Sequence, residues 1–406
     1  MTKKTIFLIN LLFILNFIYK LYEYLLSYSF DYPKQSNFIT YSQGFVRRGL
    51  WGELIKFTHS LNINTFHFIK IFSLTVFFSL IYYFYKQFKK NNLSINFLLL
   101  PFSISYIFLS NFIEFKDYFL ILLIVLLAKL LKLNLDNRIR FLLINTVLVV
   151  GILIHEQFFF LTTPFFIFYF ADKINSKKKY INKLLISTLY FVPALLALYL
   201  TIKFHGSRDV ANKLFAESIN LLPQNVGPYE MTGGISSIGG NLRFQLKYMF
   251  QDLIWNGFSR GVSYLLFTLT LLYILLNFNL FKTTKTNFQK NKKLYTIFCF
   301  QLLMMLPIFL FAIDWSRFIS LALLSSLVLY FETQDFSNQY INKIQDIVST
   351  KSDYCFKLFL KDNRSTFYII NYFCMIPYLE LGNTPWQFTN SILMLMNYIT
   401  KIIAIV

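Results

Sequence analysis

The chain has 406 residues, of which 56% are hydrophobic, 20% aromatic and only 14% charged. Soluble domains carry about 25% charged residues, so this composition excludes an ordinary soluble enzyme and indicates an integral membrane protein. The apolar runs do not alternate polar and apolar residues as the strands of a membrane barrel do. We therefore expect an all-α polytopic bundle of membrane-spanning helices.

The formal net charge is +20, with 39 Lys and Arg against 19 Asp and Glu. The lysines are dispersed among short segments between the apolar runs, which indicates membrane orientation and contact with anionic lipids. A nucleic-acid partner is not expected, because its binding face would gather the basic residues. The three cysteines have no CxxC spacing, so neither a disulfide framework nor a zinc site is predicted. No cofactor is expected, and no metal site is indicated.

The apolar runs predict about twelve transmembrane helices in a single integral membrane domain, residues 1–406, with both termini in the cytoplasm. The first run exceeds signal-peptide length and is expected to be retained. The predicted spans are 5–27, 68–85, 96–112, 118–135, 141–155, 157–172, 184–203, 261–281, 294–313, 318–332, 366–381 and 389–406. Longer segments separate some of them: outer loops 28–67 and 204–260, and the cytoplasmic segment 333–365.

The basic residues orient these spans. Lysine clusters at 86–90, 177–179 and 290–293 fall on one side, which the positive-inside rule assigns to the cytoplasm. The opposite side holds six of the nine arginines: Arg47, Arg48, Arg208, Arg243, Arg260 and Arg317. A guanidinium binds phosphate through two parallel hydrogen bonds, whereas an ammonium is a hydrated point charge. The arginines therefore predict a diphosphate site, with interfacial snorkelling as the alternative.

The first outer loop contains the most motif-like segment, Gly-Phe-Val-Arg-Arg-Gly-Leu-Trp-Gly-Glu at 44–53. It leads into an amphipathic stretch, 50–59, that is expected to form a helix on the membrane surface. Glycines would let the backbone approach a ligand, and the start of the helix would offer donors to an anion. Trp51 is a candidate for stacking on a sugar ring. The alternative is that Arg47 and Arg48 contact lipid phosphates.

Tight outer turns hold the candidate catalytic residues. In the turn His155-Glu156-Gln157, Glu156 is predicted to act as general base or as the partner of an arginine, and His155 to orient it or bind an acceptor hydroxyl. An ordinary polar turn is the alternative.

In the turn 314–317, Asp314 is a further catalytic candidate, Arg317 a candidate phosphate ligand and Trp315 a candidate for stacking on a sugar ring. The alternative is that the Asp and the Arg of this turn pair with each other. Asp117, in another outer turn, is typical of an acidic residue near an acceptor.

The second outer loop, 204–260, is long and rich in glycine and proline. It contains Arg208, Arg243 and Arg260, together with Trp255 as a sugar-stacking candidate. We expect a mobile lid that closes over the substrate. A dispensable loop would have the same composition.

These residues give the chain a resemblance to the O-antigen and capsule polymerases of bacterial surface polysaccharides, and more broadly to polyprenyl-dependent membrane glycosyltransferases. The likeness covers the whole chain and is architectural: its length, its number of spans, its enlarged outer loop and its outer arginines, with Glu156 as acid or base. It implies a bacterial inner-membrane enzyme that joins undecaprenyl-diphosphate-linked repeat units on the periplasmic side. The implied partners are polyprenyl-linked oligosaccharides, membrane lipids and a chain-length regulator.

Two other functions remain open. A flippase for lipid-linked oligosaccharides would need polar residues in mid-span and helices broken by Gly or Pro, and mid-span positions here are almost purely apolar. A membrane acyltransferase acting on polysaccharide would use His155 as its base.

The predicted topology can be tested by labelling single cysteines with a membrane-impermeant reagent in intact spheroplasts. Cysteines at positions 47, 156 and 317 should react from outside, and a cysteine at 178 should react only after the membrane is opened. Labelling of positions 47, 156 and 317 from different sides would contradict the topology.

Overall fold

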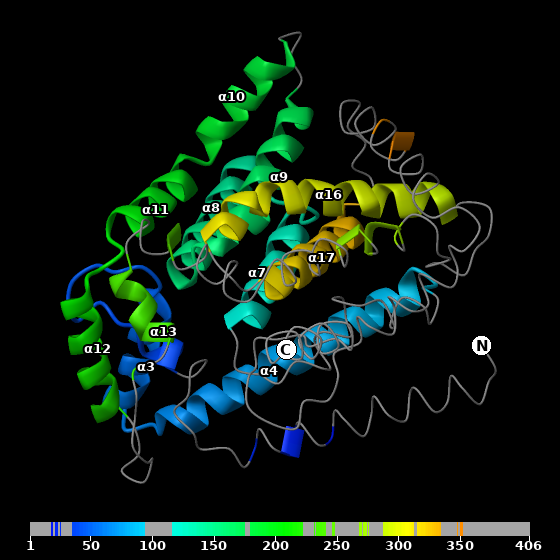
Figure 1. The fold of residues 1–406 in the computed structure, drawn as a ribbon. Coiled ribbons are helices and arrows are strands. Elements are labelled where there is room, and N and C mark those ends of the chain that lie inside the picture. The colour runs from blue at the N-terminus through cyan, green and yellow to red at the C-terminus, as the bar shows by residue number, and fades with distance from the viewer. Residues whose placement is uncertain are drawn as a thin grey trace, which may run out of the picture. The chain divides into compact units, whose positions relative to one another are not determined.

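The computed structural model describes residues 35–93, 116–174, 179–221, 233–240, 287–311 and 315–333, with some isolated positions outside these ranges. All regular elements in this part of the chain are helices, as predicted (Figure 1). The chain divides into two compact units, one of residues 1–83 and 112–244, the other of residues 84–111 and 245–406. Apart from isolated residues, the predicted spans 5–27, 96–112, 261–281, 366–381 and 389–406 and the cytoplasmic segment 333–365 lie outside the described residues.

The first unit contains most of the described helices. Their bounds are η1 Ser36–Phe38, α3 Gly49–Ser60, α4 Thr65–Lys90, α7 Lys116–Leu130, α8 Asn137–Ile154, α9 Gln157–Lys173, α10 Tyr180–Tyr190, α11 Val192–Lys203, α12 Arg208–Asn220, α13 Gly233–Ser236 and η2 Ser237–Gly239. The last two turns of α4, residues 84–90, belong to the second unit, with α16 Asn287–Phe311 and α17 Trp315–Glu332.

Three described helices are long and apolar enough to cross a membrane: Thr65–Lys90, Asn137–Ile154 and Lys292–Leu310. They coincide with three predicted spans. α7 and α9, at 15 and 17 residues, are shorter than the roughly 20 residues that a helix needs to cross the hydrocarbon core of a bilayer. The described residues therefore support a helical membrane protein with three candidate spans, or up to four if a bent pair counts as one, and the count of twelve stays a prediction.

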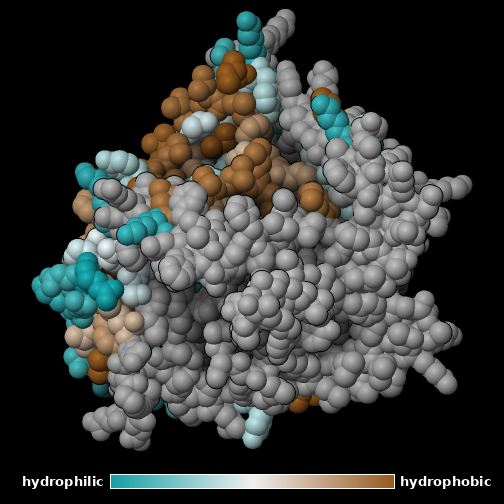
Figure 2. Space-filling view, in the orientation of Figure 1, coloured by the Kyte–Doolittle hydropathy of each residue, from teal (hydrophilic) through white to brown (hydrophobic). Residues whose placement is uncertain are grey.

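The bent pair is α10 and α11, where a single span over 184–203 was predicted. The two helices are bent by 67° at Phe191, so the prediction of one continuous helix is wrong. Pro193 supplies the reason, because proline fits the first turn of a new helix but breaks the interior of an old one. Asn145 of α8 donates its Nδ2 hydrogen to the Tyr190 carbonyl at 3.0 Å, which satisfies an acceptor at the end of α10. Figure 2 shows a broad apolar surface in the region of α10 and α11.

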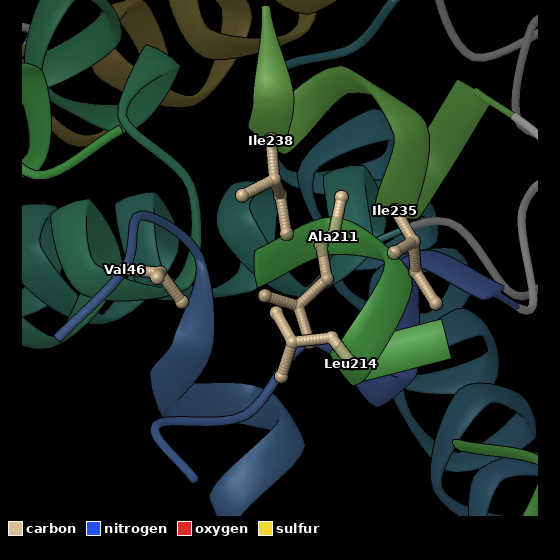
Figure 3. Close-up of a cluster of buried hydrophobic side chains, with 6 residues drawn as sticks. Val46, Ala211, Leu214, Ile235 and Ile238 are labelled. Atoms are coloured by element: carbon tan, nitrogen blue, oxygen red, sulfur yellow. The ribbon is translucent and has the colours of Figure 1, made fainter. Parts of the chain in front are cut away.

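Both predicted outer loops contribute to one small core. Its buried residues are Ile39, Val46, Ala211, Leu214, Ile235 and Ile238 (Figure 3). Polar contacts reinforce the junction, since Glu217 accepts hydrogen bonds from Ser42 and Gln43, and Thr65 Oγ1 donates to the Leu221 carbonyl at 2.7 Å. The described part of 204–260 is therefore mainly helical and packed against residues of the first outer loop, and its closure over a substrate stays a prediction.

Two glycines of the 44–53 segment are needed for this packing. A Cβ on Gly52 would lie 1.9 Å from the Ile39 carbonyl oxygen, and one on Gly49 would lie 2.2 Å from the Tyr41 ring. These glycines were predicted to let the backbone approach a ligand, but the space beside them is filled by Tyr41 and Ile39 of the protein itself. α3 can therefore lie directly against residues 39–41.

In the second unit, polar side chains join helix ends. Gln87 Nε2 near the end of α4 donates to Glu332 Oε1 at the end of α17 at 2.8 Å. Lys293, in the first turns of α16, donates to the Thr333 carbonyl at 3.1 Å. Helix ends that are expected on the cytoplasmic side thus meet one another.

Substituting Gly52 by Ala should lower the free energy of unfolding by about 3 kcal/mol, because the new methyl group overlaps backbone that cannot retreat without moving α3. Gly44→Ala is the matched control: nothing lies within 4 Å of its Cβ position, and only its φ of +92° opposes the change, at a cost of about 1 kcal/mol. Thermal unfolding of the detergent-solubilised protein measures both. A Gly52→Ala variant that melts no lower than Gly44→Ala would contradict the contact.

Candidate functional site

Arg47 and Arg48 lie in the turn that leads into α3. The turn begins with a hydrogen bond from the Gly44 N–H to the Tyr41 carbonyl at 3.0 Å, and the Arg47 N–H donates to the Phe204 carbonyl at 3.1 Å. Arg48 caps α3 with φ +68°, a left-handed conformation that costs a non-glycine residue about 1 kcal/mol. The surrounding contacts hold this backbone and thereby fix the directions of both arginine side chains.

Glu156 is the partner of Arg48. α8 ends at Ile154, His155 is extended, and Glu156 is the N-cap residue of α9. The Arg48 Nε lies 2.9 Å from Glu156 Oε2 and 3.2 Å from Oε1, and Arg48 Nη2 also donates to Oε1. The edge of the Arg48 guanidinium thus faces the Glu156 carboxylate in the bidentate geometry that makes arginine–carboxylate pairs strong.

Arg47 shares the same carboxylate at longer range. Its Nη1 lies 3.9 Å from Glu156 Oε1, too far for a hydrogen bond, while its Nη2 donates to the Ser237 carbonyl. Its buried Nε has no partner among the described residues. The side chains of Arg47, Arg48 and Glu156 are 16%, 17% and 21% exposed, so each of them is partly open to solvent.

Further polar residues surround this group. His155 Nδ1 lies 3.5 Å from Glu156 Oε2 and accepts the Gln157 N–H at 3.3 Å. The side chain of Gln157 donates to Asp117 Oδ1 at 2.7 Å, which links α9 to the first described turn of α7. Asp117 and its neighbour Lys116 are both buried, and their opposite charges add nothing to the net charge around the site.

The site carries more positive than negative charge. Two guanidinium groups share one carboxylate, and the α3 helix start that follows them adds a further partial positive charge. A cation at a helix N-terminus is on the unfavourable side of the dipole, so the Arg48 N-cap needs a nearby anion. Glu156 supplies one charge; a phosphate or diphosphate, with more charge and more acceptor oxygens, complements the pair better.

Burial opposes the ionised form of Glu156, but Arg48, with smaller effects of His155 and Arg47, outweighs it and holds the pKa of Glu156 well below its usual value. Burial and the charge of Arg48 lower the pKa of Arg47 to about 10, which still leaves Arg47 protonated at neutral pH. A carboxylate stabilised in this way is a weak base. The predicted contact of Glu156 with an arginine is present, and proton transfer at Glu156 stays a prediction that requires release from Arg48.

The other predicted site residues are spread over the chain. Trp51 is only 5% exposed, and its ring centroid lies 4.6 Å from that of Phe72 and 5.7 Å from that of Phe119, so aromatic neighbours take the place predicted for a sugar. Arg208 is exposed at the start of α12. Arg317, in the second unit, lies 5.7 Å over the Phe318 ring. Arg243, Trp255, Arg260, Asp314 and the Trp315 side chain lie outside the described residues.

Two contributors to the site were not predicted. The Ser237 carbonyl carries no signal in the sequence, because any residue has a carbonyl group. Lys116 is buried beside Asp117, and only its position just ahead of a long apolar run hints at this burial. In the described part of the chain, no group of three or more His, Cys, Asp or Glu residues is placed to hold a metal ion.

Comparison with protein-family models, with curated proteins and with solved structures finds no match. The function is therefore inferred from the site's own geometry and charge.

Acid should remove the stabilisation that Glu156 provides. Because the folded-state pKa of Glu156 is depressed, its contribution is present above the unfolded-state value, about 4.3, and is lost as the pH falls below it. Glu156→Gln should lower the free energy of unfolding by about 2 kcal/mol at pH 7, less than for a fully buried pair because the site is partly exposed. The difference in the free energy of unfolding between wild type and Glu156→Gln should shrink as the pH falls from about 5 to about 3, because Glu156 becomes protonated in the unfolded state over this range.

The control is Asp209→Asn, which removes an exposed ion pair with Lys213 and should change the free energy of unfolding by less than about 0.5 kcal/mol. Chemical denaturation followed by tryptophan fluorescence at each pH measures both variants. An equal pH profile for wild type and Glu156→Gln would show that Glu156 is not the ion-paired carboxylate described here.

Proposed function

We propose that this protein is a membrane glycosyltransferase of the polysaccharide polymerase type, which joins sugar units carried on undecaprenyl diphosphate at the periplasmic face of a bacterial inner membrane. The observation that carries the proposal is the arginine pair at the start of α3, two fixed guanidiniums with one shared carboxylate. Such a pair fits the diphosphate that every lipid-linked sugar donor of this class presents.

The position of the pair relative to the candidate spans supports a lipid-borne ligand. His155 and Glu156 directly follow the candidate span Asn137–Ile154, and the candidate span Thr65–Lys90 begins five residues after α3 ends at Ser60. A site at the ends of apolar helices lies at the depth of lipid headgroups. The diphosphate of a polyprenyl carrier lies at that depth as well, with its chain in the bilayer.

In the proposed reaction, a hydroxyl oxygen of the acceptor sugar forms a bond to the anomeric carbon of the donor sugar. The bond between that carbon and the diphosphate oxygen breaks, and its electron pair stays on the departing diphosphate. Arg47 and Arg48 stabilise this charge as it develops, which is the interaction that lowers a barrier most effectively. The hydroxyl proton passes to a carboxylate, for which Glu156 remains the candidate in the described part of the chain.

Lipid-linked oligosaccharide transport is the second candidate function, and the break between α10 and α11 favours it. Transporters place broken helices at their substrate sites. Here Asn145 donates to the Tyr190 carbonyl on one side of the break at Phe191. Exposed leucines such as Leu189 and Leu196, 69% and 54% exposed, border the break, so its surroundings are largely apolar. The charged site lies elsewhere, at the turn of Glu156, and for this reason we prefer group transfer.

Replacing Arg48 by Ala in the native host should lower the amount of long-chain polysaccharide on a gel by about a hundredfold, the usual effect of losing a donor that stabilises transition-state charge. Arg48→Lys should fail to restore wild-type levels, because an ammonium cannot bind through two parallel hydrogen bonds. The matched control is Lys213→Ala, which removes an exposed cation of α12 and should leave the polysaccharide unchanged.

The location of unused substrate separates the two candidate functions in the same strains. Accumulation of single repeat units at the cell surface supports polymerisation, and accumulation of short lipid-linked units on the cytoplasmic side supports transport. Long-chain polysaccharide that is unchanged in Arg48→Ala would contradict the proposed function.

A further inference from the structure

Glu156 occupies the part of Arg48 that a phosphate would use. The contact involves Nε and one Nη of the guanidinium, the edge that binds two oxygens of a phosphate in parallel. The left-handed backbone of Arg48 and the hydrogen bond of the Arg47 N–H to Phe204 restrict where this edge can point. A ligand phosphate on Arg48 and the carboxylate of Glu156 on the same edge therefore exclude each other.

Arg47 has donors to spare for the same ligand. One of its N–H groups binds the Ser237 carbonyl, its Nε has no partner among the described residues, and its Nη1 stands 3.9 Å from Glu156. A single carboxylate cannot satisfy both arginines, whereas the two phosphates of a diphosphate have enough oxygens for both. The exchange of one carboxylate for a diphosphate thus gains hydrogen bonds at Arg47 and preserves those at Arg48.

We propose that the diphosphate of the substrate displaces the Glu156 carboxylate from Arg48, so that Glu156 is the internal counter-ion of the empty site and is released when the site is filled. This inference rests on the proposed function, because it takes the ligand of the arginines to be a diphosphate. It deepens that function by coupling donor binding to the state of the carboxylate. His155, with Nδ1 3.5 Å from Oε2, is the neighbour that remains beside the released group.

Release gives Glu156 two roles in sequence. In the empty site it lowers the cost of holding two guanidiniums together and is too strongly stabilised to accept a proton. Once the diphosphate takes over Arg48, the carboxylate loses its bidentate partner and becomes a stronger base beside the bound donor. The base is then active only when a donor is present, which prevents proton transfer in an empty site.

The sign of one affinity change tests this inference. If Glu156 competes with the ligand, Glu156→Gln should bind inorganic pyrophosphate about tenfold more tightly than wild type, because the internal anion is gone. If Glu156 only positions the arginines, the same variant should bind pyrophosphate more weakly. Isothermal titration calorimetry of the full chain in detergent, with pyrophosphate as the probe, distinguishes the two.

Glu53→Gln is the matched control, since it removes one negative charge from α3 and leaves the Arg48–Glu156 pair intact. The Glu53 carboxylate accepts the Tyr41 N–H at 2.5 Å. Its affinity for pyrophosphate should stay within about twofold of wild type. If Glu53→Gln and Glu156→Gln gain affinity for pyrophosphate equally, the gain comes from the change in net charge alone, and the inference is overturned.

Glu156→Asp provides a second variant should Glu156→Gln fail to fold. It keeps the charge but retracts it by one methylene group, so it should bind pyrophosphate severalfold more tightly than wild type. Binding that is lost in Arg48→Ala but unchanged or weakened in both Glu156 variants would overturn displacement and leave the diphosphate site standing. Absence of pyrophosphate binding in wild type and in every Glu156 variant would overturn both the displacement of Glu156 and the diphosphate site.

Discussion

The ion pair between Arg48 and Glu156 is the constraint on which the described site depends. It joins residues that are 108 positions apart in the sequence, one at the start of α3 and one at the start of α9. A guanidinium next to a helix start is costly unless an anion lies close by, so the turn before α3 and the turn before α9 must fold together. Arg47 then extends the connection to Ser237 of η2. The two arginines and Glu156 together thereby connect three segments of the first unit.

In the described candidate spans, charged residues lie near the helix ends. Glu156 follows α8, Gln87 and Glu332 meet where α4 and α17 end, and Lys293 lies in the first turns of α16. The interiors of α8, α16 and α17 between these points carry no charged residue. Exposed leucines cover part of α10 and α11. This separation is the pattern that a bilayer imposes, because charges are tolerated at its surfaces and expensive at its centre.

Much of the helical framework was predictable from periodicity and hydropathy. The amphipathic stretch 50–59 became α3 Gly49–Ser60, and the apolar runs 68–85 and 141–155 became α4 and α8. The pairing of Arg47 and Arg48 with Glu156 was anticipated only as one of several options, because composition cannot tell which outer turns come together. Hydropathy also could not reveal the bend at Phe191, since the residues on both sides of it are equally apolar. The role of the glycines could not be predicted either. A missing side chain allows close approach, but the sequence does not show whether a ligand or another segment of the protein's own chain comes close.

The backbone of Arg48 has a consequence of its own. At φ +68° a glycine or an asparagine would fit the turn more easily than arginine does. Side chain and main chain at this position therefore make opposite demands: the backbone conformation disfavours arginine by about 1 kcal/mol, and the ion pair with Glu156 favours it. A glycine or an asparagine at 48 would relax the turn but leave Glu156 without its bidentate partner. A library selected only for thermal robustness should therefore exchange Arg48 only together with Glu156, whereas one selected for activity should retain both.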